Sequence, residues 1–195
     1  NSKSKIYIAG HTGLVGSAII RELKKNGFQK IITATRSQLD LINQQAVLKF
    51  LKRKKPDFIV IAAAKVGGIY SNNKYKGQFI YENLMIQTNL IHASYLAGVK
   101  KLVFLGSSCI YPKFAKQPIK EEYLLTGLLE PSNDTYALAK IAGLKMCDAY
   151  NKQYNVKYIC LMPANLYGPN DNYDPVYSHF YPALISKIHK AKRDK

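Results

Sequence analysis

The sequence is short of cysteine and of acidic residues, and it contains no tryptophan. Its three cysteines, Cys109, Cys147 and Cys160, stand far apart, so they predict neither a disulfide framework nor the C-x-x-C pairs typical of zinc sites. We expect no metal site and a reducing, cytoplasmic setting. No apolar run approaches the roughly 20 residues that a membrane-spanning helix needs. We therefore expect no signal peptide and no membrane partner.

The scarcity of acidic residues leaves a large positive charge. Twelve Asp and Glu face 29 Lys and Arg, and the formal net charge is +17. Such an excess is typical of proteins that bind nucleic acid, anionic surfaces or polyanionic ligands. Here the basic residues are spread along the chain, and only residues 52–55 and 187–195 are densely basic. We expect solvated helix ends and a basic tail rather than a nucleic-acid partner, and the sequence does not explain the excess.

What the sequence does contain is a regular alternation of elements. With 195 residues and 47% hydrophobic content, it suits one domain, or one domain and part of a second. Short apolar runs predict strands within residues 4–10, 30–35, 57–64, 100–108 and 156–164. Apolar residues at helical spacing predict helices within residues 13–27, 43–55, 79–98 and 136–154. The strands are mostly continuous apolar runs, as expected where both faces are covered, so we predict an α/β doubly wound parallel sheet, the Rossmann fold.

A glycine-rich loop lies between the first strand and the first helix. The stretch GHTGLVG places glycines at Gly10, Gly13 and Gly16. Glycine permits a tight turn and a close approach to a ligand, and the helix N-terminus favours an anionic pyrophosphate. The alternative is a turn that needs glycine for its geometry alone. In this strand–turn–helix context we predict a dinucleotide site, with further ligands at the carboxyl ends of the other strands.

The end of the second strand bears on the choice of cofactor. A site for NAD usually carries Asp or Glu there, whereas this chain has Thr35 and Arg36. An arginine can bind the 2′-phosphate of NADP, so we predict NADP(H). Asp40, a little farther along, keeps NAD(H) open, and Arg36 is alternatively an exposed surface charge.

A serine, a tyrosine and a lysine follow the fourth strand. Tyr136 and Lys140 are four residues apart and therefore share one helix face, and Ser107 stands at the end of the strand. We expect the lysine ammonium to favour the tyrosine phenolate, bringing the pKa of Tyr136 down towards neutral pH. Ser107 can hydrogen-bond the same carbonyl that Tyr136 protonates.

These motifs resemble the extended short-chain dehydrogenase/reductase family. The stretches AAAKVGGI, GSSCIYPK, AKQPI, YALAKIAG and NLYGPND are similar, more closely, to its GDP-L-fucose synthase branch, over residues 6–188. The resemblance implies a bifunctional enzyme. Such enzymes invert C3 and C5 of GDP-4-keto-6-deoxy-D-mannose and reduce its C4 ketone with NADPH.

The same resemblance assigns roles to residues. Cys109 is the implied base and His179 the implied acid of epimerisation, while Tyr136, Lys140 and Ser107 serve the reduction. Asn165 and Lys187 are implied substrate contacts, and the long helices imply a homodimer. Cys147 and Cys160 are expected in the core. The predicted cofactor-binding residues are Gly10, Thr12, Gly13, Leu14, Val15, Gly16, Arg36, Asp40, Leu41, Ala63, Ala64, Leu105, Gly106, Ser107, Lys140, Pro163, Asn165, Leu166 and His179.

The chain also departs from the family. Ala164 stands where members commonly have threonine, and Thr12 where bacterial members often have arginine. Members continue well past residue 195, so we expect residues 1–178 to form the NADP-binding domain and residues 179–195 to begin a substrate region that is mostly absent. Such a chain is expected to bind NADPH, to turn over poorly and to expose apolar surface.

Two other functions stay open. The first is an NAD-dependent nucleotide-sugar 4-epimerase, against which Arg36, Cys109 and His179 argue. The second is a non-catalytic nucleotide- or RNA-binding module on the same fold, which the charge favours and the complete set of catalytic residues disfavours.

Overall fold

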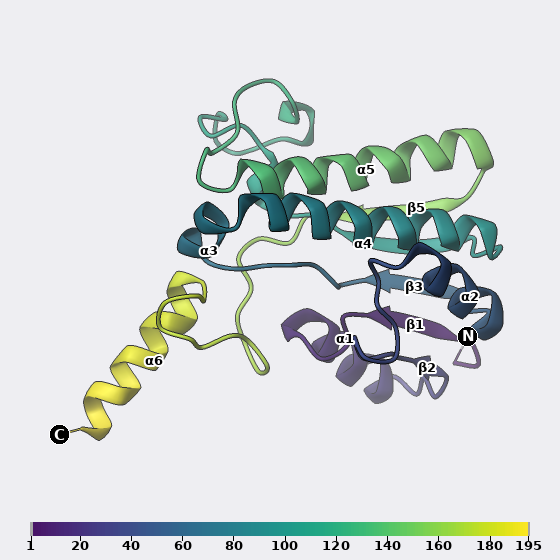
Figure 1. The fold of residues 1–195 in the computed structure, drawn as a ribbon, viewed down its shortest axis with the longest axis horizontal. Helices are drawn as coiled ribbons and strands as arrows, with labels where there is room; N and C mark the ends of the chain where they lie inside the picture. The colour runs from purple at the N-terminus through teal and green to yellow at the C-terminus, as the bar shows by residue number, and fades with distance from the viewer. Residues whose placement is uncertain (1, 195) are drawn as a thin grey trace.

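The computed structural model describes residues 2–194 and contains a five-stranded parallel sheet in the order β2-β1-β3-β4-β5 (Figure 1). The strands are β1 (Ile6–Ala9), β2 (Ile31–Ile32), β3 (Phe58–Ile61), β4 (Lys101–Leu105) and β5 (Lys157–Leu161). All five predicted strands are present. The strand order is one of the two common doubly wound arrangements, with the reversal of direction between β1 and β3. The predicted fold is therefore confirmed.

The helices connect consecutive strands. They are α1 (Leu14–Lys25), α2 (Gln44–Lys54), α3 (Ile69–Lys74), α4 (Lys76–Leu96), α5 (Asp134–Tyr154) and α6 (Phe180–Arg193), with short 3-10 turns η1 (Ser108–Ile110) and η2 (Glu121–Tyr123). The sequence predicted α1, α2, α4 and α5, but not α3 or α6. The start of α2 shows how local residues set a boundary, since the Asn43 side chain accepts a hydrogen bond from the Ala46 amide.

The core lies between the sheet and the helices α2, α4 and α5. Buried side chains of the strands, such as Ile59 and Phe104, pack there against Leu90 and Ile91 of α4. Cys147 belongs to this core, and Cys160 is partly buried against it, as predicted. The apolar strands and the long helices thus hold the carboxyl ends of the strands in fixed positions.

One prediction about the sheet is wrong. Continuous apolar strands suggested that both faces are covered, yet Ile159 and Leu161 of β5 are 56% and 49% exposed. Side chains alternate along a strand, so Tyr158 and Cys160 face α5 while Ile159 and Leu161 lie on the opposite face. Apolar content alone does not reveal that a face lacks its cover. This exposure agrees with the expectation of exposed apolar surface.

The strand β2 is shorter than predicted. Ile31 and Ile32 pair with Ile6 and Tyr7, and pairing ends there. Beyond β2 the side chain of Gln38 accepts a hydrogen bond from the Thr35 amide at 2.9 Å, so the chain turns instead of continuing along β1.

The last helix, α6, projects away from the sheet at the end of the chain (Figure 1). Within residues 2–194 no helix has the length and hydropathy required to cross a bilayer.

Candidate active site

The glycine loop packs directly on the residues that follow β3. Gly10 has φ +83°, and a Cβ on it would lie 2.6 Å from the Ala63 amide nitrogen. A Cβ on Gly16 would lie 2.1 Å from the carbonyl oxygen of Gly10. Only glycine fits at these two positions, so the loop, the start of α1 and the β3 end form one tightly packed unit.

The N-terminus of α1 suits an anionic ligand. Its N-cap, Gly13, offers no side chain to cap the first amides, and the first turn contains no acidic residue. Unpaired amides at a helix N-terminus attract negative charge. Thr12 and Gly13 are exposed, and Leu14 and Val15 are half-buried. The arrangement fits a pyrophosphate, as the glycine spacing predicted.

The two candidates for recognising the cofactor ribose differ in their local partners. Arg36 and Asp40 are both exposed in the loop after β2. The Asp40 carboxylate accepts a hydrogen bond from the Ile42 amide at 3.1 Å and so stabilises the loop. Within the described part of the chain, Arg36 has no ion-pair partner. The guanidinium is therefore available for a phosphate.

The catalytic candidates of β4 and α5 gather at the end of β4. Lys140 is 4% exposed and donates a hydrogen bond from Nζ to the Leu105 carbonyl at 2.8 Å. The same Nζ lies 5.7 Å from the centre of the Tyr136 ring. Ser107 caps η1 and accepts a hydrogen bond from the Cys109 amide at 3.5 Å. The structure thus brings Ser107, Cys109, Tyr136 and Lys140 together.

The electrostatics of this cluster differ from the expectation that Lys140 favours a phenolate. Burial raises the pKa of Tyr136 above its ordinary value, and a Cys109 thiolate would raise it further. Burial lowers the pKa of Lys140 to about 8. Burial also raises the pKa of the Cys109 thiol, although Ser107 and Lys140 oppose the shift. Desolvation outweighs the attraction between the charged forms, so Tyr136 is a proton donor at neutral pH.

The burial of Lys140 predicts a dependence of stability on pH. The pKa falls from 10.5 to about 8 on folding, so the cost of burying the ammonium is present in full below pH 8. That cost is lost as the pH rises towards 10.5, and it amounts to about 3 kcal/mol at roughly 1.4 kcal/mol per pKa unit. We expect Lys140→Met to raise the free energy of unfolding at pH 7 by about 2 kcal/mol, because the lost hydrogen bond offsets about 1 kcal/mol.

Urea unfolding at pH 7 and pH 9.5 measures this effect. The wild type should gain stability between the two pH values, and Lys140→Met should gain less. Lys145→Met, an exposed lysine of the same helix, is the matched control and should keep the wild-type slope. Equal slopes in wild type and Lys140→Met would contradict the account.

The implied acid, His179, lies on a different part of the site. It is exposed at the N-cap of α6, and its neighbour Ser178 packs against the loop after β3. The Gly68 amide donates to the Tyr177 carbonyl at 3.0 Å, and a Cβ on Gly68 would lie 2.3 Å from the Ser178 carbonyl oxygen. Within residues 2–194 no hydrogen bond joins the His179 ring to the cluster at β4. Gly68 therefore sets the position of the segment that carries His179.

The segment between β5 and α6 passes close to α1. The Asn170 side chain donates to the Ser17 hydroxyl at 3.0 Å, and Gly168 lies beside Leu14. This contact brings the predicted residues after β5 towards the glycine loop. Pro163 is half-buried, and Asn165 and Leu166 are exposed. Lys187 is exposed on α6.

Sequence reasoning missed the polar residues that hold the loop after β3. Asn83 of α4 is 2% exposed, accepts a hydrogen bond from the Lys65 amide at 2.8 Å and donates to the Lys65 carbonyl at 2.9 Å. The Lys65 ammonium forms an ion pair with Glu82 at 2.9 Å. Buried Gln87, one turn later, donates to the Ala139 carbonyl beneath Tyr136 and Lys140. The signal was a pair of amide side chains four residues apart in an apolar helix.

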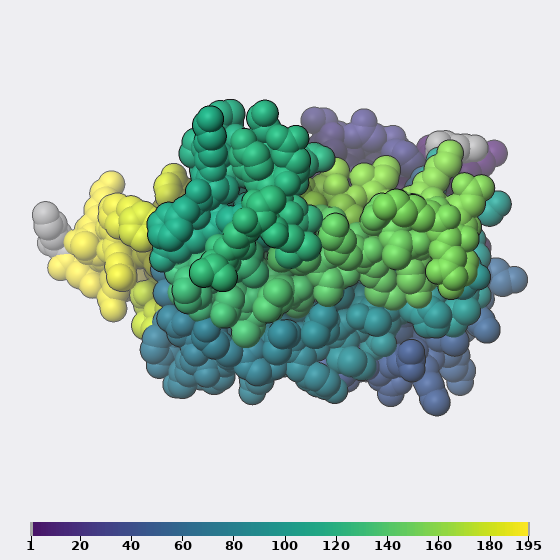
Figure 2. Space-filling view, turned by 90° about the horizontal axis from the view of Figure 1, so that it is seen from above, coloured from purple at the N-terminus to yellow at the C-terminus, as the bar shows by residue number. Residues whose placement is uncertain are grey.

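The irregular segment between η1 and α5 stands beside the site. Lys113 and Glu130 close its base with an ion pair of 2.8 Å, and Lys76 of α4 binds Asp134 at 3.0 Å. Figure 2 shows this teal segment raised over the start of α5. Its side chains at Phe114 and Leu128 are 88% and 89% exposed.

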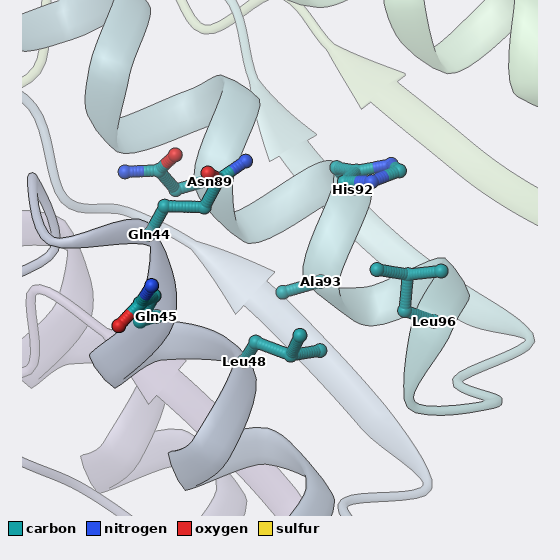
Figure 3. Close-up of a pocket in the computed structure, with 7 residues that line it drawn as sticks. All are labelled: Gln44, Gln45, Leu48, Asn89, His92, Ala93 and Leu96. Carbon is teal, nitrogen blue, oxygen red and sulfur yellow. The ribbon is translucent and has the colours of Figure 1, made fainter.

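A cavity of about 250 Å³ lies elsewhere, between α2 and α4 (Figure 3). Its polar groups already have structural partners. Asn89 donates to the carbonyls of Leu41 and Ile42, and His92 hydrogen-bonds the Tyr150 hydroxyl. None of the predicted catalytic residues lines this cavity, so it is not the candidate active site. Among residues 2–194 no cluster of three or more His, Cys, Asp or Glu is suited to a metal ion.

The fold, the glycine loop and the Tyr–Lys pair define a nucleotide-dependent enzyme of the Rossmann class. The model of the NAD dependent epimerase/dehydratase family matches residues 6–195, and the chain belongs to this family.

Within the family, the most similar proteins share one name. The chain is 58% identical over 189 residues to the putative GDP-L-fucose synthase 2 of Arabidopsis thaliana, covering 97% of this chain and 58% of that protein. It is 53% identical over 190 residues to the GDP-L-fucose synthase of Escherichia coli, covering 97% and 59%. The chain thus spans just under three fifths of the length of these relatives.

Solved structures agree. A GDP-mannoheptose C4 reductase of Campylobacter jejuni with NADP bound is 48% identical, with a TM-score of 0.92 over 98% of this chain and 59% of that one. A GDP-L-fucose synthetase of Naegleria fowleri bound to NADP is 28% identical, with a TM-score of 0.89 over 98% and 59%.

Proposed function

We propose that this chain supplies the NADP(H) site and the catalytic groups of an enzyme that converts GDP-4-keto-6-deoxy-D-mannose to GDP-L-fucose. The observation that carries the proposal is the gathering of Ser107, Cys109, Tyr136 and Lys140 at the end of β4. The similarity to GDP-L-fucose synthases from plants and bacteria supports the choice of substrate.

In the first stage the protein inverts C3 and C5. A proton on a carbon beside a ketone is acidic because its removal gives an enolate. Cys109 removes that proton from one face of the sugar, and His179 returns one to the other face. Tyr136 and Ser107 donate hydrogen bonds to the C4 oxygen, which carries the enolate charge. Because Tyr136 is held protonated, it can donate to this oxygen at neutral pH.

In the second stage the C4 ketone becomes an alcohol. Bound NADPH supplies the hydride that reduces C4. Tyr136 gives its proton to the C4 oxygen, and Ser107 holds that oxygen in place. Lys140 lies behind Tyr136 and stabilises the negative charge that the tyrosine acquires.

A second function is C4 reduction of a GDP-linked sugar without epimerisation. Two observations favour it. The C4 reductase of Campylobacter jejuni is 48% identical to this chain, and burial raises the pKa of the Cys109 thiol, which reduces its strength as a base at neutral pH.

The cofactor choice is tested by titrating NADPH and NADH into the chain and following nucleotide fluorescence. We expect NADPH to bind more tightly, and Arg36→Ala to weaken NADPH binding roughly 10- to 100-fold, since a charge-assisted hydrogen bond is lost. NADH affinity should hardly change. Arg53→Ala, an exposed arginine of α2, is the control. Equal affinity of the wild type for both nucleotides would argue against the NADP site.

Several finer points belong to the same proposal. Residues 1–178 act as the NADP-binding domain, and residues 179–195 begin a substrate region in which Lys187 contacts the GDP-sugar. The protein works in the cytoplasm as a homodimer that pairs through α4 and α5. Exposed apolar side chains on these helices, Tyr81 and Leu138, support the choice of interface.

A further inference from the structure

A lysine stands at or near the start of every strand. Lys5 and Lys30 directly precede β1 and β2, and Lys101 and Lys157 are the first residues of β4 and β5. Lys55 lies three residues before β3. All five are exposed. Because the strands are parallel, these lysines lie at the amino edge of the sheet, opposite the candidate active site (Figure 1).

The register aligns four of the lysines in a row. Lys101 and Lys157 are direct partners on neighbouring strands, and Phe58 pairs with Lys101. The Lys5 carbonyl accepts from the Phe58 amide at 3.2 Å, and the Lys30 carbonyl accepts from the Ile6 amide at 3.0 Å. Neighbouring strands are about 4.8 Å apart, so the row extends over roughly 19 Å. We call Lys5, Lys30, Lys55, Lys101 and Lys157 the lysine row.

Helix ends add charge to the same edge. Each helix that follows a strand returns to the start of the next one, so its last turn lies beside the lysine row. The last turn of α1 carries Lys24 and Lys25, and that of α2 carries Lys52, Arg53 and Lys54. Cations at helix C-termini are favourable in themselves. This explains the helix ends but not the lysines on the strands.

The lysine row lacks compensating charge. Among residues 2–194 none of its five members has an ion-pair partner. Asp57, the nearest acidic residue in the sequence, accepts from the Lys5 backbone amide at 2.7 Å. Lys101 lies 5.2 Å from the centre of the Phe58 ring. Like charges on directly paired residues destabilise a sheet, so Lys101 opposite Lys157 has a cost that an anionic partner relieves.

We propose that the lysine row binds the phosphate backbone of single-stranded RNA. A narrow row with one lysine per strand matches a linear polyanion better than a lipid surface. A membrane would also take up apolar side chains, and at this edge only Leu96 and Tyr154 are large, apolar and exposed. Tyr154 lies at the end of α5, stacked on Tyr95 at 4.0 Å, and offers an aromatic surface of the kind that nucleobases use.

Fluorescence anisotropy of a labelled 12-nucleotide oligouridine tests the proposal at 50 and 200 mM salt. The triple variant Lys5→Gln, Lys101→Gln, Lys157→Gln should weaken binding at least 10-fold. It should also lower the slope of log affinity against log salt by about 2, at roughly 0.7 per phosphate contact. The matched control, Lys190→Gln, Lys192→Gln, Arg193→Gln on α6, removes the same charge and should leave the affinity nearly unchanged.

Two further arms make the outcomes decisive. NADPH should bind both variants as it binds the wild type, and it should not displace the oligouridine, because the two sites lie at opposite edges. The proposal is overturned if the wild type does not bind RNA at 50 mM salt, if both triple variants lose affinity equally, or if NADPH displaces the RNA. It is also overturned if phosphatidylserine vesicles, and not RNA, lose binding with the row variant.

Discussion

Tyr136→Phe should abolish C4 reduction while leaving NADPH affinity within about twofold. The substitution removes only the hydroxyl, which burial keeps protonated and ready to donate. A positioned general acid contributes roughly 10²- to 10⁴-fold to a rate. The loss should reach the upper part of that range, because in our account the same hydroxyl also donates to the C4 oxygen during epimerisation.

Turnover is measured in a chimera that continues residues 1–195 with the C-terminal remainder of the Escherichia coli relative, so that the substrate region is complete. Tyr154→Phe, in the same helix but exposed at its end, is the matched control and should keep wild-type turnover. If Tyr136→Phe kept more than a tenth of the wild-type rate, another group would have to supply the proton.

Gly68→Ala should separate epimerisation from cofactor binding. The new Cβ would lie 2.3 Å from the Ser178 carbonyl oxygen, so the segment before α6 must move away by much of an ångström. His179 directly follows Ser178 and moves with it. A displacement of about 1 Å at a catalytic group can cost roughly 100-fold in rate. The glycine loop and Arg36 are not touched, so NADPH affinity should stay unchanged.

The readout is the rate at which deuterium from solvent enters C3 and C5 of the keto sugar in the chimera. Gly77→Ala is the control, since a Cβ on Gly77 meets no atom within 4 Å. We expect Gly68→Ala to lower exchange at one or both carbons roughly 100-fold and Gly77→Ala to have no effect. Normal exchange in Gly68→Ala would show that Gly68 does not position the acid.

Much of the fold could be predicted because periodicity and glycine positions carry the information locally. The five strands and the helices α1, α2, α4 and α5 follow from apolar spacing within each segment, and the glycine loop follows from Gly10 and Gly16. The short helices and α6 were missed. The sequence of α6 is rich in basic residues, and its polar surface resembles a solvated tail.

The parts that could not be predicted depend on contacts between distant segments. Gly68 against Ser178, and Asn83 against Lys65, join residues 110 and 18 positions apart. The protonation states depend on burial, which a sequence does not give. Tyr136 and Lys140 were correctly assigned to one helix face, yet desolvation, rather than their mutual attraction, decides the direction of both pKa shifts.

The central claim is that the cluster at the end of β4 catalyses epimerisation as well as reduction. The most direct test incubates the chimera with GDP-4-keto-6-deoxy-D-mannose in deuterated water without NADPH and follows C3 and C5 by NMR. Our account predicts deuterium at both carbons, lost in Cys109→Ala and retained in Cys147→Ala. Reduction by NADPH with no exchange at either carbon would contradict it and identify the protein as a C4 reductase.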